Sequence, residues 1–451
     1  MTRFNNTKTT IYLALRNLTR QKRRSFMLAL AIGFGFFVVT AIDALASGAV
    51  DCLEDQISQM NGGNVFVQGI EHLHDEDGNI DKKYNAVIRD PVFIENLINE
   101  NNIEHEYYSQ RTQTSGTIIF NNKKIMGNVF GCDFAKEDYL LKSLVVLEGN
   151  IEDIFLPHSM IISKKNADAL NVKIGDSVLY STNTISNQKN VGEFTVRLII
   201  KDPSLMSSLM IYAPIDEINE LVEIPEGGYT MFSIGLKDKS KQNLIAQNLE
   251  DEIRDAGMNV TNRMDAYKAS PTNPAGQLRK QLNNLLIEGT LYTSFSMNDA
   301  VPALKTVVSV VHIVTTCILL VILLIVMVGI SNTYRMILYE RIREIGTMRA
   351  VGMTGKQSGK MFTTEAVILS LIGAVAGFVL GVIVMFICSR FNITNESLSF
   401  FLRNGHLTYQ ISAGSMIGKY ILMIVLTVLA VRGTANKASS LSPASALRST
   451  K

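Results

Sequence analysis

The residues with the most regular chemical spacing lie between positions 339 and 354. This stretch reads YERIREIGTMRAVGMT and mixes acidic with basic side chains. On a helix, Glu340 would lie beside Arg343 and Arg341 beside Glu344, because residues three positions apart share a face. The chemistry that this segment predicts is therefore ion pairing and docking.

The same segment has an apolar side. Ile342, Ile345, Met348 and Val351 recur at three-residue intervals, so a helix from about Tyr339 to Ala350 would be amphipathic. Such a helix can seat in a groove on a cytoplasmic partner. Basic residues beside a membrane span also anchor loops at lipid headgroups, and composition alone leaves both interpretations open.

A phosphate-binding loop is not expected just after this segment. Gly352, Gly355 and Lys356 superficially suggest one, but the glycines are too close together and Gln357 stands where Ser or Thr would hold magnesium. The chain also lacks a nucleophile elbow, an HExxH helix and a CxxC pair. We expect no cofactor and a non-catalytic chain that does not itself hydrolyse ATP.

One polar cluster carries side chains that bind metals elsewhere. His72, His74 and the acidic residues 75–77 lie in a turn-rich stretch, where a solvated loop is favoured over a metal site. The four cysteines of this 451-residue chain do not define a disulfide framework. Cys52 and Cys132 are the extracytoplasmic candidates for a bridge, and the sequence leaves their pairing open.

Four apolar blocks of the sequence are candidate membrane spans, and they must position the charged and polar residues described above. Overall composition is ordinary, with 47% apolar residues and a net charge of +2. Blocks at 26–48, 306–331 and 364–388 reach the roughly 20 residues that a helix needs to cross a bilayer. The fourth block, 415–432, is shorter and carries Lys419, which could snorkel to the interface. The first block is longer than the apolar part of a cleaved signal peptide and predicts an anchor.

The third block contains glycines at four-residue spacing. Gly373, Gly377 and Gly381 would line one face of a helix and predict close packing against another helix, with chance spacing as the alternative. Asp43, His312 and Lys419 are the main ionisable exceptions within the spans and lie towards their ends. The lack of midplane charges argues against ion channels and proton-coupled carriers.

The distribution of Lys and Arg predicts the orientation. Both are frequent before the first block and after the second, whereas the loop between the third and fourth blocks has only Arg390 and Arg403. The positive-inside rule places both termini on the cytoplasmic side of the membrane, which we expect to be a bacterial inner (plasma) membrane. The expected order is a cytoplasmic interfacial helix (1–25), a span (26–48), an extracytoplasmic domain (49–305), a span (306–331), a cytoplasmic coupling loop and helix (332–363), a span (364–388), a short extracytoplasmic loop (389–414), a span (415–432) and a cytoplasmic tail (433–451).

The large segment between the first two spans predicts an α+β domain. β-like runs at 64–68, 117–120 and 193–200 alternate with helical patterns, including 164–170 and 241–256. The expected fold class is thus an α-helical integral membrane protein with four transmembrane helices and a large α+β extracytoplasmic domain between the first and second.

Several stretches resemble the FtsX-like, MacB-type permeases of ABC transporters, including the LolC and LolE subunits of lipoprotein-release systems. The family pattern Glu-Arg-x-Arg-Glu-Ile-Gly, then Arg-Ala-x-Gly, is met by residues 340–346 and 349–352. Residues 160–180 resemble the MacB-type periplasmic core, 63–67 a strand of lipoprotein-release permeases, and 432–448 the family's C-terminal tail. The resemblance implies that the residues coupling to the ATPase are Glu340, Arg341, Arg343, Glu344, Gly346, Arg349 and Gly352.

The resemblance also implies partners. They are two copies of an ABC ATPase subunit, a second permease chain in a homodimer or heterodimer, and membrane lipid, with no nucleic acid and no metal. The favoured function is ATP-driven lipoprotein release from the inner membrane. Export of peptides, toxins or antibiotics from the periplasm is the alternative, and a non-transporting membrane sensor or scaffold is the alternative of another class.

Overall fold

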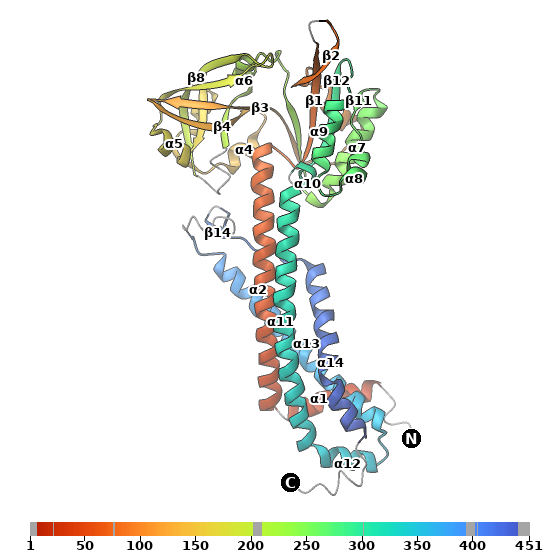
Figure 1. Ribbon diagram of the computed structural model, residues 1–451. Helices are drawn as coiled ribbons and strands as arrows, with labels where there is room; N and C mark the ends of the chain where they lie inside the picture. The colour runs from red at the N-terminus through yellow and green to blue at the C-terminus, as the bar shows by residue number, and fades with distance from the viewer. Residues whose placement is uncertain are drawn as a thin grey trace. The chain divides into compact units, whose positions relative to one another are not determined.

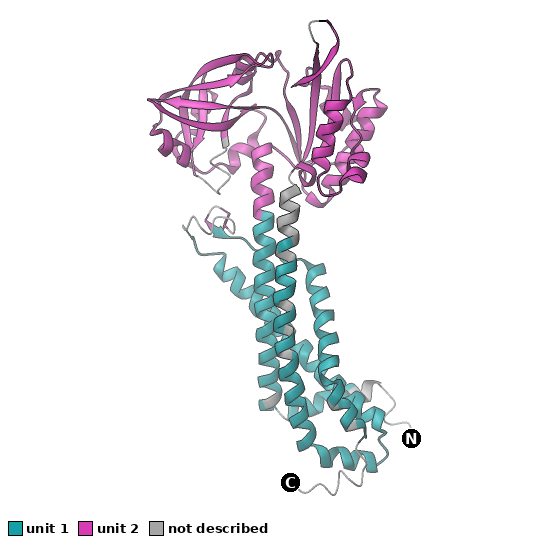
Figure 2. Cartoon of the chain, in the orientation of Figure 1, with its two compact units in different colours: residues 1–51, 308–393, 406–451 teal, residues 52–307, 394–405 magenta. Residues whose placement is uncertain are grey.

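The computed structural model divides the chain into two compact units (Figures 1 and 2). The membrane unit comprises residues 1–51, 308–393 and 406–451, and the β-rich unit comprises 52–307 and 394–405. The structure describes residues 7–20, 22–74, 77–201, 210–300, 302–393, 402–403 and 405–440. The end of the expected C-terminal motif, from Pro443 to Arg448, lies outside this described part.

Four helices of the described chain are long and apolar enough to cross a membrane. They are α2 (Lys22–Asn61), α11 (Pro302–Glu340), α13 (Gly355–Cys388) and α14 (Ala413–Ser440). Two shorter helices, α1 (Thr7–Arg20) and α12 (Ile342–Ala350), complete the helices of the membrane unit. The β-rich unit is inserted between α2 and α11 in sequence, so the predicted fold class is confirmed.

The glycine row of α13 lies against α2. A Cβ atom on Gly377 would overlap the backbone of Gly33, and one on Gly373 would stand 2.7 Å from the carbonyl oxygen of Ala29. At Gly381 an added Cβ would meet the side chain of Thr40 at 3.1 Å. The two helices therefore approach each other closely because these three positions lack side chains.

An ion pair joins α2 and α14 inside the membrane unit. Asp43 is 3% exposed and pairs with Lys419, which is 9% exposed, and Ser415 donates a hydrogen bond of 3.2 Å to the same carboxylate. Lys419 thus pairs with a carboxylate of another helix. The pairing lowers the cost of burying the two charges, because each would be costly to bury alone.

The β-rich unit is built on one twelve-stranded sheet with helices packed against it. Its main strand order is β11-β12-β1-β10-β3-β4-β9-β6-β8-β5, with β2 paired to β1 and β7 paired to β3 and β8. The strands are β1 (Val65–His74), β2 (Ile80–Ala86), β3 (Tyr107–Phe120), β4 (Lys123–Cys132), β5 (Val146–Gly149), β6 (Ser159–Ser163), β7 (Ser177–Asn183), β8 (Lys189–Ile200), β9 (Met210–Pro214), β10 (Met231–Gly235), β11 (Asn259–Val260) and β12 (Thr290–Ser296). The helices are α3 (Phe93–Glu100), α4 (Asp138–Ser143), α5 (Lys164–Leu170), α6 (Ile215–Val222), α7 (Gln242–Asp255), α8 (Arg263–Ala269), α9 (Pro274–Asn284) and α10 (Met297–Ala300).

The long strand β3 joins two lobes of this unit. Its first residues, Tyr107 to Arg111, pair with β10, and residues 116–119 pair with β7. Figure 1 shows β1, β12 and helices α7, α8 and α9 on one side of β3, and β4, β8, α5 and α6 on the other. Each lobe has its own buried apolar cluster, one around Phe232 and Leu249 and one around Tyr180 and Val196.

A buried arginine fixes the end of α2 within the β-rich unit. Arg111 on β3 is fully buried, and its Nη1 donates to the carbonyl oxygen of Met60 at 2.7 Å and of Gln59 at 3.3 Å. Its Nη2 contacts Glu137 at 2.6 Å and the hydroxyl of Tyr139 at 2.9 Å. Because the last carbonyls of a helix lack intrahelical partners and carry partial negative charge, this guanidinium caps α2.

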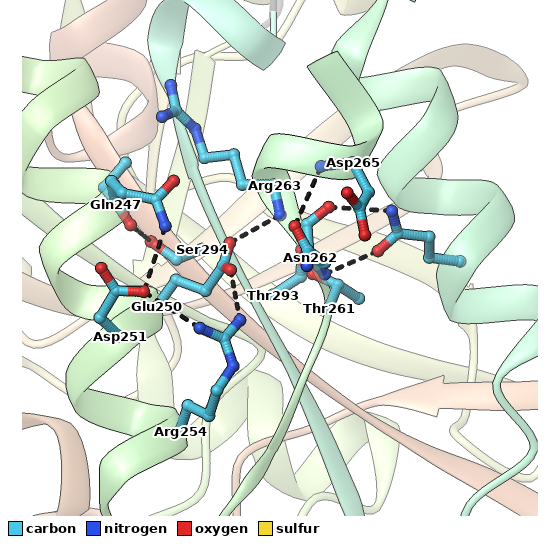
Figure 3. A network of polar contacts seen from close by, with 12 residues as sticks. Gln247, Glu250, Asp251, Arg254, Thr261, Asn262, Arg263, Asp265, Thr293 and Ser294 are labelled. Atoms are coloured by element: carbon cyan, nitrogen blue, oxygen red, sulfur yellow. Dashed lines mark hydrogen bonds and ion pairs between the residues drawn. The ribbon is translucent and has the colours of Figure 1, made fainter. Parts of the chain in front are cut away.

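A second buried arginine, on α8, binds a carboxylate that lies just before α11. Arg263 pairs with Asp299, which is fully buried, at 2.8 Å. Figure 3 shows the adjoining network, in which Glu250 of α7 accepts from the backbone N–H of Arg263 at 2.7 Å and from the side chain of Arg254. These contacts tie α7 and α8 to the segment that leads into the second membrane-length helix.

The histidine cluster does not form the predicted loop. His72 and His74 lie on β1, which continues six residues beyond the predicted run that ended at Gln68. The ring nitrogens of His72 lie 3.0 Å and 3.1 Å from the carbonyl oxygens of Asp81 and Leu285, and the side chain is buried. The acidic residues 75 and 76 are outside the described part of the chain.

The cysteines are unbridged, and one of them should be unreactive. Cys132 is 1% exposed, and burial raises the pKa of its thiol. Since the thiolate is the reactive form, we expect maleimide at pH 7.5 to label Cys132 of the folded chain at least about tenfold more slowly than the thiol introduced by Met126→Cys, position 126 being 86% exposed. The measurement is mass spectrometry of chains in which the other three cysteines are replaced by alanine. Equal labelling rates before denaturation would contradict this expectation.

Candidate coupling surface

The predicted helix from Tyr339 to Ala350 is two helices, with the break at Arg341. Helix α11 ends at Glu340 and α12 begins at Ile342. Arg341 is 5% exposed, and its Nη1 lies 3.2 Å from Glu365 of α13, which is 3% exposed. The break between the two helices is thus at the residue whose guanidinium pairs with a buried carboxylate of α13.

The charged pairs of this region connect three helices. The Nε of Arg341 lies 3.1 Å from Glu344, as the i, i+3 spacing predicted. Glu344 also pairs at 3.2 Å with Arg20 at the end of α1, and its side chain is 41% exposed. Ion pairs thus connect the N-terminal part of α12 to α1 and α13.

The apolar stripe mostly faces inwards. Ile345 is fully buried in the core of the membrane unit, and Met348 packs against that core. The prediction that this stripe seats in a partner's groove is therefore wrong for these two residues. Val351 is different, because it is 76% exposed just after α12, and Tyr339 is 63% exposed just before it.

The turn after α12 depends on a glycine and a capping box. Gly352 has φ of 109°, in the left-handed region that glycine adopts without strain. Thr354 then caps α13 by accepting from the backbone N–H of Gln357, whose side chain bonds back to the N–H of Thr354. Gln357, the residue that argues against a phosphate-binding loop, thus forms part of the N-terminal cap of α13.

The seven predicted coupling residues divide into an inner and an outer set. Arg341 and Gly346 are buried, Glu344 and Arg349 are half-buried, and Arg349 donates to the carbonyl oxygen of Ser439 at 3.3 Å. Glu340, Arg343 and Gly352 are exposed. We call the exposed residues Tyr339, Glu340, Arg343, Thr347 and Val351 the coupling surface.

Side-chain contacts link α12 to α1, α13 and α14. Helix α12 is held by the buried Ile345 and by the pair of Arg341 with Glu365, and Glu344 pairs with Arg20 of α1. No group of three or more His, Cys, Asp or Glu residues that could hold a metal occurs among the described residues. The contributions of Arg20 and Ser439 were not predicted, because both lie far from α12 in sequence.

The comparisons with known proteins each cover part of the chain. Residues 316–443 match the FtsX-like permease C-terminal domain. An uncharacterized ABC transporter permease of Methanocaldococcus jannaschii is 27% identical over 134 residues, which are 29% of this chain. The match spans 33% of the archaeal protein's own length.

Two solved structures show partial likeness. The extracellular domain of the transporter YknZ from Gram-positive bacteria is 14% identical, covering 43% of this chain and 95% of that domain with a TM-score of 0.29. The periplasmic region of MacB from Actinobacillus actinomycetemcomitans is 15% identical, covering 46% of this chain and 90% of that region with a TM-score of 0.28.

Proposed function

We propose, from the match of residues 316–443 to the FtsX-like permease C-terminal domain, that the whole chain is the permease subunit of an ABC transporter. In this proposal a separate chain hydrolyses ATP, two copies of it dock at the coupling surfaces of a permease dimer, and α12 lies in the cytoplasm. The β-rich unit lies on the opposite side of the bacterial inner membrane and moves the cargo.

The observation that carries the proposal is how α12 is held. A segment that only anchored the chain at lipid headgroups would need exposed basic residues alone. Here a buried ion pair between Arg341 and Glu365 fixes α12 to α13, while Tyr339 and Val351 remain exposed beside it. Large apolar side chains on a rigid base, surrounded by charges, are typical of a protein docking surface.

We expect Val351→Glu to release the ATPase. A carboxylate buried in an apolar contact loses hydration, and changes at the centre of an interface typically cost about 2 kcal/mol or more, roughly 30-fold in affinity. Val351 is 76% exposed and lies between the membrane-length helices α11 and α13, so the chain should still insert and fold. Copurification with the ATPase, together with cargo-stimulated hydrolysis by the complex, measures the effect.

Met126→Glu is the matched control, because Met126 is 86% exposed in the β-rich unit and receives the same new charge. It should leave ATPase binding unchanged. Glu344→Lys is a less selective test, since it also breaks the pairs with Arg20 and Arg341. Normal ATPase binding and normal hydrolysis in the Val351→Glu complex would remove the coupling role.

For the cargo, we propose a lipid-modified protein. The support is that residues 63–67 resemble a strand of lipoprotein-release permeases. In the structure they form the turn after α2 and the start of β1. Isolation of the complex from native membranes and mass spectrometry of what copurifies tests this. Copurified soluble peptides in place of lipoproteins would favour export, and absence of any ATPase would favour a sensor or scaffold.

A further inference from the structure

A groove between α13 and α14 is lined by cations and uncharged residues, and none of the described residues that line it is a carboxylate. Its volume is about 350 Å³, and its charged residues are Lys356, Lys360 and Arg432. Thr363, Asn436 and Ser439 add hydroxyl and amide groups that can donate hydrogen bonds. Three exposed cations around neutral donors make a site suited to an anion with several oxygen acceptors.

The floor of the groove consists of small residues. A Cβ on Gly359 would stand 3.1 Å from the carbonyl oxygen of Ala435, and one on Gly355 would overlap that of Ser439. The two helices therefore come close together along their small residues. Lys356 and Lys360 are one helical turn apart on α13, so both ammonium groups can reach over the same rim.

The groove lies where both helices leave their apolar stretches. The apolar span of α14 ends at Gly433, one residue after Arg432. Leu429, three residues earlier and also in the lining, is 50% exposed. A ligand would thus meet cations at headgroup level and an apolar side chain towards the bilayer core.

We propose that this groove binds the headgroup of an anionic phospholipid, with its phosphate among Lys356, Lys360 and Arg432 and an acyl chain along Leu429. Basic pockets between transmembrane helices bind such headgroups in other membrane proteins. A protein partner would need acidic residues here and would leave Leu429 facing lipid. The groove shares no residue with the coupling surface, and the proposal does not depend on the transported cargo.

The test is native mass spectrometry of the delipidated full-length chain titrated with dioleoylphosphatidylglycerol and, separately, dioleoylphosphatidylcholine. The wild-type chain should retain the anionic lipid preferentially. Each cation near an anionic surface contributes roughly a fivefold gain in binding. The triple variant with Lys356→Gln, Lys360→Gln and Arg432→Gln should therefore lower phosphatidylglycerol retention at least about tenfold and leave phosphatidylcholine retention unchanged. Lys360→Gln alone should lose about fivefold, and Lys360→Arg should retain most binding.

The matched control replaces three other exposed cations of the membrane unit, Lys22, Arg23 and Arg335, with glutamine. It should keep the preference. Equal loss of phosphatidylglycerol retention in both triple variants would show that binding depends on general surface charge, and would overturn the proposed site. Displacement of the lipid by millimolar glycerol 3-phosphate would show a site for soluble phosphate instead. Loss of ATPase copurification without loss of lipid would identify a protein interface and also overturn the proposal.

Discussion

Replacing Gly377 with leucine is expected to prevent α13 from packing against α2 and to leave little folded protein. Even a Cβ atom at this position would overlap the backbone of Gly33, which no rotamer change can relieve. Overpacking a core typically costs 1–3 kcal/mol when side chains can adjust. Here two helix backbones must separate, so we expect about 3 kcal/mol or more and loss of the contacts at Gly373 and Gly381 as well.

The measurement is the yield of monodisperse chain by fluorescence-detected size exclusion, followed by thermal unfolding of whatever is recovered. Gly418→Leu is the control, since Gly418 lies in the membrane-length part of α14 and an added Cβ there meets nothing within 4 Å. It should behave as the unmodified chain does. A Gly377→Leu chain with normal yield and normal melting would show that the close approach is not needed for folding.

The sequence predicted the membrane architecture well because apolar length is a local property. A run of about 20 apolar residues has few alternatives to a transmembrane helix, and four such helices are present. The glycine spacing also indicated a packed face of α13. It could not identify α2 as the neighbour, because helix spacing shows which residues share a face and not which helix that face meets.

The coupling segment shows why spacing alone was insufficient. The pairing of Arg341 with Glu344 follows from helix geometry and was predicted, whereas the pairing of Arg341 with Glu365 depends on the packing of α13. That second pair accompanies the break between α11 and α12 and the inward turn of Ile345. Amphipathic periodicity showed that the helix has an apolar face, but it could not show whether this face meets the chain's own core or a partner.

We expect Arg111→Met to destabilise the β-rich unit by about 3–5 kcal/mol. Removing one member of a buried ion pair leaves the other charge without compensation, and Glu137 is 1% exposed. Burial also raises the pKa of Tyr139, so its hydroxyl stays protonated and remains a hydrogen-bond partner for the carboxylate without replacing the lost positive charge. Calorimetric unfolding of the full-length chain measures the loss. Lys142→Met is the control, because Lys142 and Asp138 form a pair whose side chains are 75% and 70% exposed, and such surface pairs contribute at most about 1 kcal/mol.

A double variant separates the two tasks of Arg111. The double variant Arg111→Met with Glu137→Met leaves neither charge of this buried pair unpaired, so most of the lost stability should return. The carbonyl oxygen of Met60 would still lack the guanidinium donor, and that of Gln59 would keep the long bond of 3.4 Å from the backbone N–H of Gly62, so the last turn of α2 should fray. Hydrogen exchange at the backbone N–H of Gly63, which is bonded to the carbonyl oxygen of Ser58 at 2.9 Å, should therefore remain faster than in the unmodified chain. If the double variant recovers both stability and slow exchange at Gly63, the arginine serves only its carboxylate. If exchange alone stays fast, the guanidinium is needed to keep the last turn of α2 formed, in addition to the hydrogen bonds that Ser109 and Ser233 donate to the carbonyl oxygens of Gly62 and Asn61.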